Sequence, residues 1–325
     1  LLEDYGLEGE WSPLDGERDQ NFRLVAPGAA YVVKIAGPDE APELTDFQVR
    51  ALLHLEANSP ELPVPRLVRS RSGACLSAVD DAAGISHALR VVTFLPGIPY
   101  GEGVFPSAAA LRHVGGFMGR VANALAGFEH PASRHFMPWN LANGVAVSRE
   151  LWSGAEDDLV ALVPGELIDY LRETALPAIN ALPSQVIHND GHNHNLLRPD
   201  ARSAEVVGLI DFGDMVHGPV ISELAVTATT FQRLCSEHLA AVKELLAGFH
   251  GAHPLGEDEV ARLWDAILLR LLITVLLSDV KVRMGGGSAA DALEDRSEAM
   301  VMLARAVRAD RDATVAELKA VCGYR

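Results

Sequence analysis

The sequence predicts an α+β fold of two lobes, with a small antiparallel sheet first and a larger, mostly helical part after it. Short β-branched and aromatic runs, separated by turn residues, recur up to about residue 97, as is typical of strands. From Ser107 onward, apolar residues repeat instead at the spacing of amphipathic helices. We therefore expect a first lobe over residues 1–97, a hinge near residues 93–97, and a helical lobe over residues 98–325.

Composition limits the functional classes. The net charge of -17 argues against nucleic-acid binding and permits attraction of a small cationic substrate. The three cysteines are scattered, as in proteins of the reducing cytosol. No secretion leader is visible, and the most apolar run, residues 266–277, is too short to span a bilayer and contains Arg270. We expect a cytoplasmic protein without nucleic-acid or membrane partners. Because the chain begins with Leu1, fusion to or association with another enzyme domain stays open.

The first lobe should open with a hairpin. Residues 17–25 and 30–35 are strand-like, and Pro27-Gly28 supplies the turn between them. A nucleotide's phosphates could lie over such a hairpin, and a plain polar hairpin is the alternative. Lys34 lies in the second strand between apolar neighbours, where an unpaired buried charge is costly, so a bound anion or an exposed strand edge would explain it.

A helix and a last strand complete this lobe. Residues 45–55 form an amphipathic helix with Leu52 and Leu55 on one face, and Thr45 with Gln48 matches a capping box. An extended linker follows at residues 60–66. The strand of residues 88–95 ends in a turn at Pro96-Gly97.

The second lobe is predicted to be a set of helices. In the first of these, Gly115, Gly116 and Gly119 should allow close packing against a neighbour. Further helices are expected over residues 164–182, 221–234, 239–249, 257–283 and 289–321.

The chemistry is concentrated between residues 186 and 214. One apolar run leads through His188 to Asp190 and then Asn195, and a second leads to Asp211. We expect the two runs to pair through the turn at Pro199-Asp200. Oxygen ligands from an Asp and an Asn suit Mg²⁺, and a neighbouring carboxylate can orient a hydroxyl and accept its proton.

The pattern His-x-Asp-x-x-x-x-Asn followed by Ile-Asp-Phe-Gly-Asp resembles the catalytic and metal loops of the aminoglycoside phosphotransferase superfamily, whose fold is that of protein kinases. It is most similar to the hydroxylysine kinase-like branch, which also occurs fused to aminotransferases. The resemblance implies transfer of the γ-phosphate of ATP or GTP to a hydroxyl of a small amine-bearing acceptor. It implies Asp190 as the base, Asn195 and Asp211 as Mg²⁺ ligands, and His188 as a structural residue of the loop.

The same resemblance assigns the nucleotide contacts. Lys34 would bind the α- and β-phosphates, and Gln20 and Asn21, with Asp19, replace the glycines of the kinase phosphate loop. Gln48 occupies the helix position where kinases place a glutamate that pairs with the lysine, so it would orient Lys34 through a hydrogen bond. Two residues at the hinge would supply backbone groups to the base: Thr93 and Leu95.

Acceptor contacts are expected from the second lobe. Trp139 would line the acceptor pocket or wedge between helices, while the role of its neighbour Asn140 is open. Asp214 would recognise an amine or cap a turn. His192 and His194 are loop residues, of which His192 could touch the acceptor. Glu223 should brace the catalytic loop.

Two other functions remain open from the sequence. The first is a metal-dependent hydrolase, because imidazole suits zinc and several histidines and acids lie close together in the sequence. Its ligands would come from His188, Asp190, His192, His194, Asp211, Asp214 and His217. The second is an inactive nucleotide-binding regulatory domain, which the neutral Gln48 and the glycine-poor loop would support.

Overall fold

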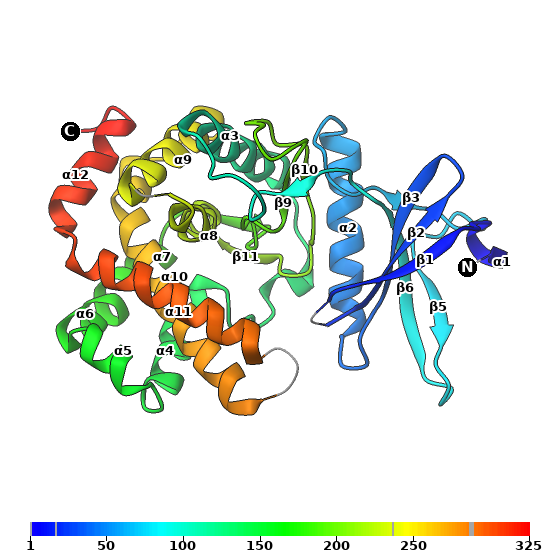
Figure 1. Cartoon of the computed structure of the whole chain (residues 1–325), viewed down its shortest axis with the longest axis horizontal. Helices are drawn as coiled ribbons and strands as arrows, with labels where there is room; N and C mark the ends of the chain where they lie inside the picture. The colour runs from blue at the N-terminus through cyan, green and yellow to red at the C-terminus, as the bar shows by residue number, and fades with distance from the viewer. Residues whose placement is uncertain (1, 17, 236, 286–288) are drawn as a thin grey trace.

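The computed structural model describes residues 2–16, 18–235, 237–285 and 289–325, so Glu17 of the predicted hairpin lies outside the described residues. It confirms the α+β class: an antiparallel sheet lies at the N-terminal side, and the rest of the described chain is mostly helical (Figure 1). The sheet has the order β1-β2-β3-β6-β4, with β5 also paired to β6. Its strands are β1 (Glu10–Leu14), β2 (Gln20–Ala26), β3 (Ala29–Ile35), β4 (Leu67–Val68), β5 (Ser77–Asp80) and β6 (Ser86–Thr93). A short helix, α1 (Leu2–Tyr5), precedes them.

The predicted hairpin is β2 and β3. Gly28 makes the turn between them with a φ of +85°, a backbone conformation that is strained for most residues with a side chain. Because side chains alternate along a strand, Val33 enters a small apolar cluster with Leu89 and Val91, while Lys34 points to the opposite face. That face looks toward helix α2 (Pro42–Asn58), which stands between the sheet and the helical lobe (Figure 1).

Helix α2 begins earlier than the sequence predicted. It starts at Pro42, a residue that is favoured in the first helical turn because it has no N–H to satisfy. Thr45 is therefore inside the helix, and the expected capping box does not form. The predicted apolar face is confirmed, since Leu52 and Leu55 are buried in the main core, where Phe47 joins them.

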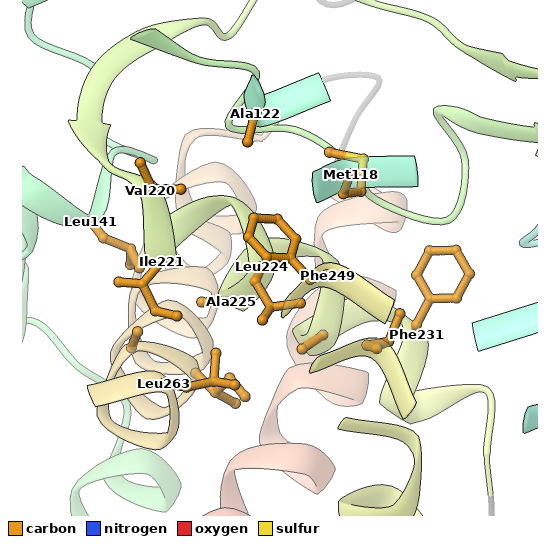
Figure 2. Packing of buried hydrophobic residues seen from close by; sticks show 14 of the residues in the cluster. Met118, Ala122, Leu141, Val220, Ile221, Leu224, Ala225, Phe231, Phe249 and Leu263 are labelled. Atoms are coloured by element: carbon orange, nitrogen blue, oxygen red, sulfur yellow. The ribbon is translucent and has the colours of Figure 1, made fainter. Parts of the chain in front are cut away.

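The helical lobe is built around α8 (Val220–Arg233) and α10 (Glu257–Met284). Figure 2 shows Leu224 of α8 among buried side chains that include Phe249 and Leu263 from neighbouring helices, and Phe231 of α8 belongs to the same cluster. The other helices are α3 (Ala108–Leu125), α4 (Gly144–Trp152), α5 (Asp157–Leu162), α6 (Gly165–Tyr170), α7 (Leu176–Asn180), α9 (His238–Ala252), α11 (Ala289–Arg308) and α12 (Arg311–Val321). Within the described part of the chain, no helix combines the length and hydropathy needed to cross a bilayer.

The close packing expected at the glycines of α3 is confirmed. A Cβ on Gly115 would lie 2.0 Å from the backbone oxygen of Leu245 in α9, and one on Gly119 would lie 2.8 Å from that of Phe249. The two helices therefore approach as closely as they do because these positions carry no side chain.

Two predicted helices are divided. The helix expected over residues 164–182 is α6 and α7, joined by a π-helical turn at Leu171–Ala175, and Pro177 lies in the first turn of α7. The helix expected over residues 289–321 is α11 and α12. Asp310 separates them because its side chain caps α12 by accepting a hydrogen bond from the N–H of Ala313.

The strands around the two motifs pair differently from the expectation. The strand before the first motif, β8 (Ser184–Ile187), pairs with β11 (Val216–Pro219) and not with the strand before Asp211. The turn at Pro199-Asp200 instead joins β9 (Leu196–Arg198) to β10 (Gly208–Leu209), and β7 (Ile98–Pro99) adds to β9. Each motif is thus a loop between two strands, anchored at both ends.

Candidate active site

The loop after β8 is held by a buried acid on α8. The carboxylate of Glu223 accepts hydrogen bonds from the backbone N–H of His188 at 2.6 Å and of Asn189 at 3.4 Å. These contacts confirm that Glu223 braces the loop. Burial raises the pKa of Glu223 to about 7. Asn189 has a φ of +64°, so the loop turns sharply before Asp190.

His188 joins this loop to the next. Its ring is fully buried and meets the edge of the Phe212 ring with centroids 4.7 Å apart. Its Nδ1 accepts a hydrogen bond from the backbone N–H of Asp190 at 3.3 Å. Burial lowers the pKa of His188 to about 4, so the ring is neutral at pH 7. These contacts describe a structural residue.

Asp190 and Asn195 meet across the loop. Nδ2 of Asn195 donates to the backbone oxygen of Asp190 at 3.0 Å and to its Oδ2 at 2.7 Å. This orientation leaves the Asn195 carbonyl oxygen for a cation. Nε2 of His192 lies 3.5 Å from the same Oδ2. Burial opposes a charged His192, but the Asp190 carboxylate outweighs that effect and the pKa of His192 is raised.

Asp211 follows β10 and faces the sheet lobe. Its φ is +61°, and its Oδ1 accepts a hydrogen bond from the N–H of Gly213 at 3.1 Å. Nζ of Lys34 lies 3.6 Å from Oδ1. Burial alone would raise the pKa of Asp211, but Lys34 and the Gly213 N–H more than offset it, so the pKa is lowered and the side chain is an anion.

These side chains open into one cavity between the sheet lobe and the helical lobe, with a volume of about 410 Å³. Most of the predicted site residues line it: Asn21, Lys34, Gln48, Trp139, Asp190, His192, Asn195, Asp211 and Asp214. The carboxylates of Asp190 and Asp211 and the amide of Asn195 line it together with several cations, and these oxygen donors are of the type that fits Mg²⁺.

Three predicted residues lie outside the lining of this cavity. Gln20 is exposed at the start of β2. Thr93 ends β6, where its N–H donates to the backbone oxygen of Arg66 at 2.9 Å and its hydroxyl accepts from the Arg66 N–H at 2.9 Å. Its N–H is therefore already used within the sheet lobe. Leu95 follows two residues later, and its backbone contact to a base stays a prediction.

Gln48 differs from the expectation. Its Oε1 accepts a hydrogen bond from the buried guanidinium of Arg90, and its Nε2 donates to Glu40 at 3.3 Å. The Gln48 amide oxygen accepts from Arg90 because a buried guanidinium needs hydrogen-bond acceptors. Lys34 is instead 3.6 Å from Asp19 as well as from Asp211.

The far end of the cavity is formed by α10 and α11 around Trp139. The Arg270 guanidinium lies 4.9 Å from the centre of the Trp139 ring and donates to its backbone oxygen at 2.6 Å. Nζ of Lys281 lies 5.7 Å from the same ring centre. Trp139 therefore both lines the cavity and packs against helices. Asn140 is a cap, because its Oδ1 accepts a hydrogen bond from the N–H of Ala142 at 3.0 Å.

Asp214 is near Asp190 and is paired with Arg18 from the β1–β2 loop. Burial raises the pKa of Asp214, the Asp190 carboxylate raises it further, and Arg18 opposes both. Neither Arg18 nor Arg270 was predicted to be a site residue. A signal for Arg270 was present, since it is the one charge within the apolar run of residues 266–277.

The histidines do not form a metal cluster. His194 is exposed and His188 is buried behind the loop. Across the residues that the structure describes, no three His, Cys, Asp or Glu side chains converge as metal ligands would. The described residues therefore show no ligand set of the kind that the hydrolase alternative requires.

Comparisons with known proteins place this chain in a family and identify structures with the same fold. The model of the phosphotransferase enzyme family (APH) matches residues 10–266. The hydroxylysine kinase of Mus musculus is 27% identical over 289 residues, which cover 82% of this chain and 76% of the relative. A microcompartment-associated aminopropanol kinase superposes with a TM-score of 0.72 at 16% identity, covering 93% of this chain and 94% of the other. An amicoumacin kinase, solved with AMP-PNP and Ca²⁺, gives 0.66 at 16% identity, covering 93% and 91%.

The family match over most of the chain, together with the shared fold, leads to one assignment. The chain belongs to the APH phosphotransferase family and is a small-molecule kinase that phosphorylates hydroxyl groups.

Proposed function

We propose that this enzyme transfers the γ-phosphate of ATP or GTP to a hydroxyl of a small acceptor that carries an amine. The observation that supports this most is the meeting of four groups in one cavity: Asp190, Asn195, Asp211 and Lys34. They come from three separate loops and strands, and Lys34 reaches across from the sheet lobe to lie 3.6 Å from Asp211.

Each group has a role that its surroundings favour. Asp190, whose loop is fixed by Glu223, orients the acceptor hydroxyl and takes its proton late in the transfer. Lys34 binds the α- and β-phosphates. Mg²⁺ held by Asn195 and Asp211 would offset the charge of the phosphate oxygens. Catalysis of this kind depends mainly on positioning and charge, which a braced loop supplies.

The acceptor end of the cavity favours an amine. Asp214, which is paired with Arg18, lies beside Asp190, and Asp295 and Glu298 of α11 also line the cavity, with Glu298 paired to Arg233. These carboxylates would attract and orient an ammonium group. The names of the relatives point the same way, since hydroxylysine and aminopropanol are both amino alcohols.

The test is a panel of amino alcohols, including hydroxylysine and aminopropanol, with ATP or GTP and Mg²⁺. We expect the wild-type enzyme to phosphorylate at least one amine-bearing acceptor faster than the same carbon chain with the amine removed. Equal rates with and without the amine would contradict the proposed acceptor class. No turnover with any hydroxyl acceptor would contradict the proposed function.

A further inference from the structure

Two cations lie side by side on the face of the sheet that looks toward the cavity. Lys34 in β3 is the cross-strand partner of Arg90 in β6, and their side chains are only 16% and 2% exposed. Like charges directly opposite each other destabilise a sheet, and a buried cation without an acceptor is costly. This pair of cations therefore needs an anion beside it. The side chain of helix α2 that contacts Arg90 is the neutral Gln48, which cannot supply that charge.

Asp19 is the anion between them. Its Oδ2 lies 2.8 Å from Nη2 of Arg90 and 3.6 Å from Nζ of Lys34. Its side chain is 11% exposed, and it stands at the end of the β1–β2 loop, immediately before β2. One carboxylate oxygen thus serves both cations and ties this loop to the middle of the sheet.

The neutral amide on α2 fits this arrangement. Arg90 donates from the same Nη2 to Gln48, so its guanidinium is shared between Asp19 and Gln48. Because Arg90 already donates to the Gln48 amide oxygen, that oxygen is engaged by Arg90 and not by Lys34. The acid that kinases place on the helix is therefore replaced here by one in the loop.

We infer that Asp19 is the positioning residue for Lys34. It holds the Lys34 ammonium on the sheet side of the cavity. Asp211 attracts the same ammonium from the helical lobe, and both carboxylates lie 3.6 Å from Nζ. Because Asp19 belongs to the β1–β2 loop, the position of Lys34 is coupled to the position of that loop. The inference rests on the proposed function, in which Lys34 contacts the nucleotide's phosphates.

A double-mutant cycle tests whether Asp19 acts through Lys34. Asp19→Asn, Lys34→Met and the combined variant are compared by kcat/KM for the nucleotide. In the presence of Lys34, Asp19→Asn should lower kcat/KM by about tenfold to a hundredfold. In the Lys34→Met background the same change should cost less than about threefold. An equal loss in both backgrounds would overturn the inference.

A second variant separates positioning from folding. Asp19→Asn combined with Arg90→Gln removes the carboxylate together with the buried cation that it neutralises, so it should unfold near the wild-type temperature. We expect its kcat/KM to stay as low as that of Asp19→Asn. Recovery of activity would show that Asp19 serves only Arg90. Asp15→Asn, an exposed change in the same loop, is the matched control and should behave as wild type.

The cycle is repeated on the dissociation constant of a Mg²⁺-bound, non-hydrolysable ATP analogue, so that it does not depend on the acceptor. The factor by which Asp19→Asn changes this constant should differ at least about threefold between the two backgrounds. A wild-type enzyme that binds the analogue but phosphorylates no acceptor would refute the proposed function alone. Identical factors in both backgrounds would refute the role of Asp19 alone.

Discussion

The ammonium of Lys34 lies 3.6 Å from Oδ1 of Asp211, and this contact joins β3 of the sheet lobe to a loop of the helical lobe. The two residues are far apart in the sequence and were predicted for different reasons, Lys34 from its apolar strand and Asp211 from its motif. Their meeting places a cation beside the acid that would hold Mg²⁺, which is the arrangement that binding of a nucleotide's phosphates requires.

Replacing Lys34 should remove most of the activity. Lys34→Met is expected to lower kcat/KM for the nucleotide about a hundredfold or more, because it removes a charge that stabilises the transferring phosphate. Lys243→Met is the matched control, since Lys243 pairs with Glu317 on the surface, outside the cavity. Steady-state kinetics at fixed acceptor concentration provides the measurement. A similar loss in both variants would mean that Lys34 has no specific role.

Asn195 should affect the Mg²⁺ concentration that the enzyme requires. Asn195→Ala removes a proposed oxygen ligand, so the Mg²⁺ concentration that gives half-maximal activity should rise about tenfold or more. Titration of Mg²⁺ at saturating nucleotide measures this directly. An unchanged Mg²⁺ requirement with a lower maximal rate would instead indicate that Asn195 only orients Asp190, with which it also shares a hydrogen bond.

The buried acid Glu223 should make stability fall as pH rises. Its pKa in the folded protein is raised from 4.5 to about 7, so the folded state keeps a proton that the unfolded state has lost. The contribution of Glu223 to the free energy of unfolding is fully present below pH 4.5, and it is lost as the pH rises through the folded-state pKa of about 7. Glu223→Gln stays neutral, so its free energy of unfolding should gain about 3 kcal/mol relative to wild type between pH 4 and 8. Denaturant unfolding at several pH values measures the difference. A pH-independent difference would contradict the assignment.

Close packing of α3 on α9 should not tolerate a methyl group at Gly115. The added Cβ would lie 2.0 Å from the backbone oxygen of Leu245, and backbone cannot move aside easily. Gly115→Ala should therefore lower the free energy of unfolding by about 2 kcal/mol or more. Gly165→Ala is the control, because nothing lies within 4 Å of a Cβ there, and it should change stability by less than about 0.5 kcal/mol.

Sequence patterns predicted the parts of the site that depend on local spacing. The motif consists of residues that follow apolar strands at a fixed spacing along the chain: Asp190, Asn195 and Asp211. The pairing of the flanking strands was not predictable in the same way, since β8 prefers the distant β11 to the nearer β10. The sequence of a short apolar strand does not determine which other strand it pairs with.

The charge network around Lys34 escaped prediction for a related reason. Asp19 and Arg90 are 71 residues apart and meet only through the register of β2, β3 and β6. Gln48 was assigned by its helix position alone, which does not reveal that Arg90 would take its amide oxygen. Roles that depend on cross-strand register need the folded sheet before they can be assigned.

Single-turnover phosphoryl transfer by Asp190→Asn tests the central claim most directly. The variant should bind the Mg²⁺–nucleotide with near wild-type affinity, because Asp190 acts on the acceptor, yet transfer phosphate at least about a thousandfold more slowly. Asp169→Asn, an exposed acid on α6, should transfer phosphate at the wild-type rate. Wild-type transfer by Asp190→Asn would contradict the account.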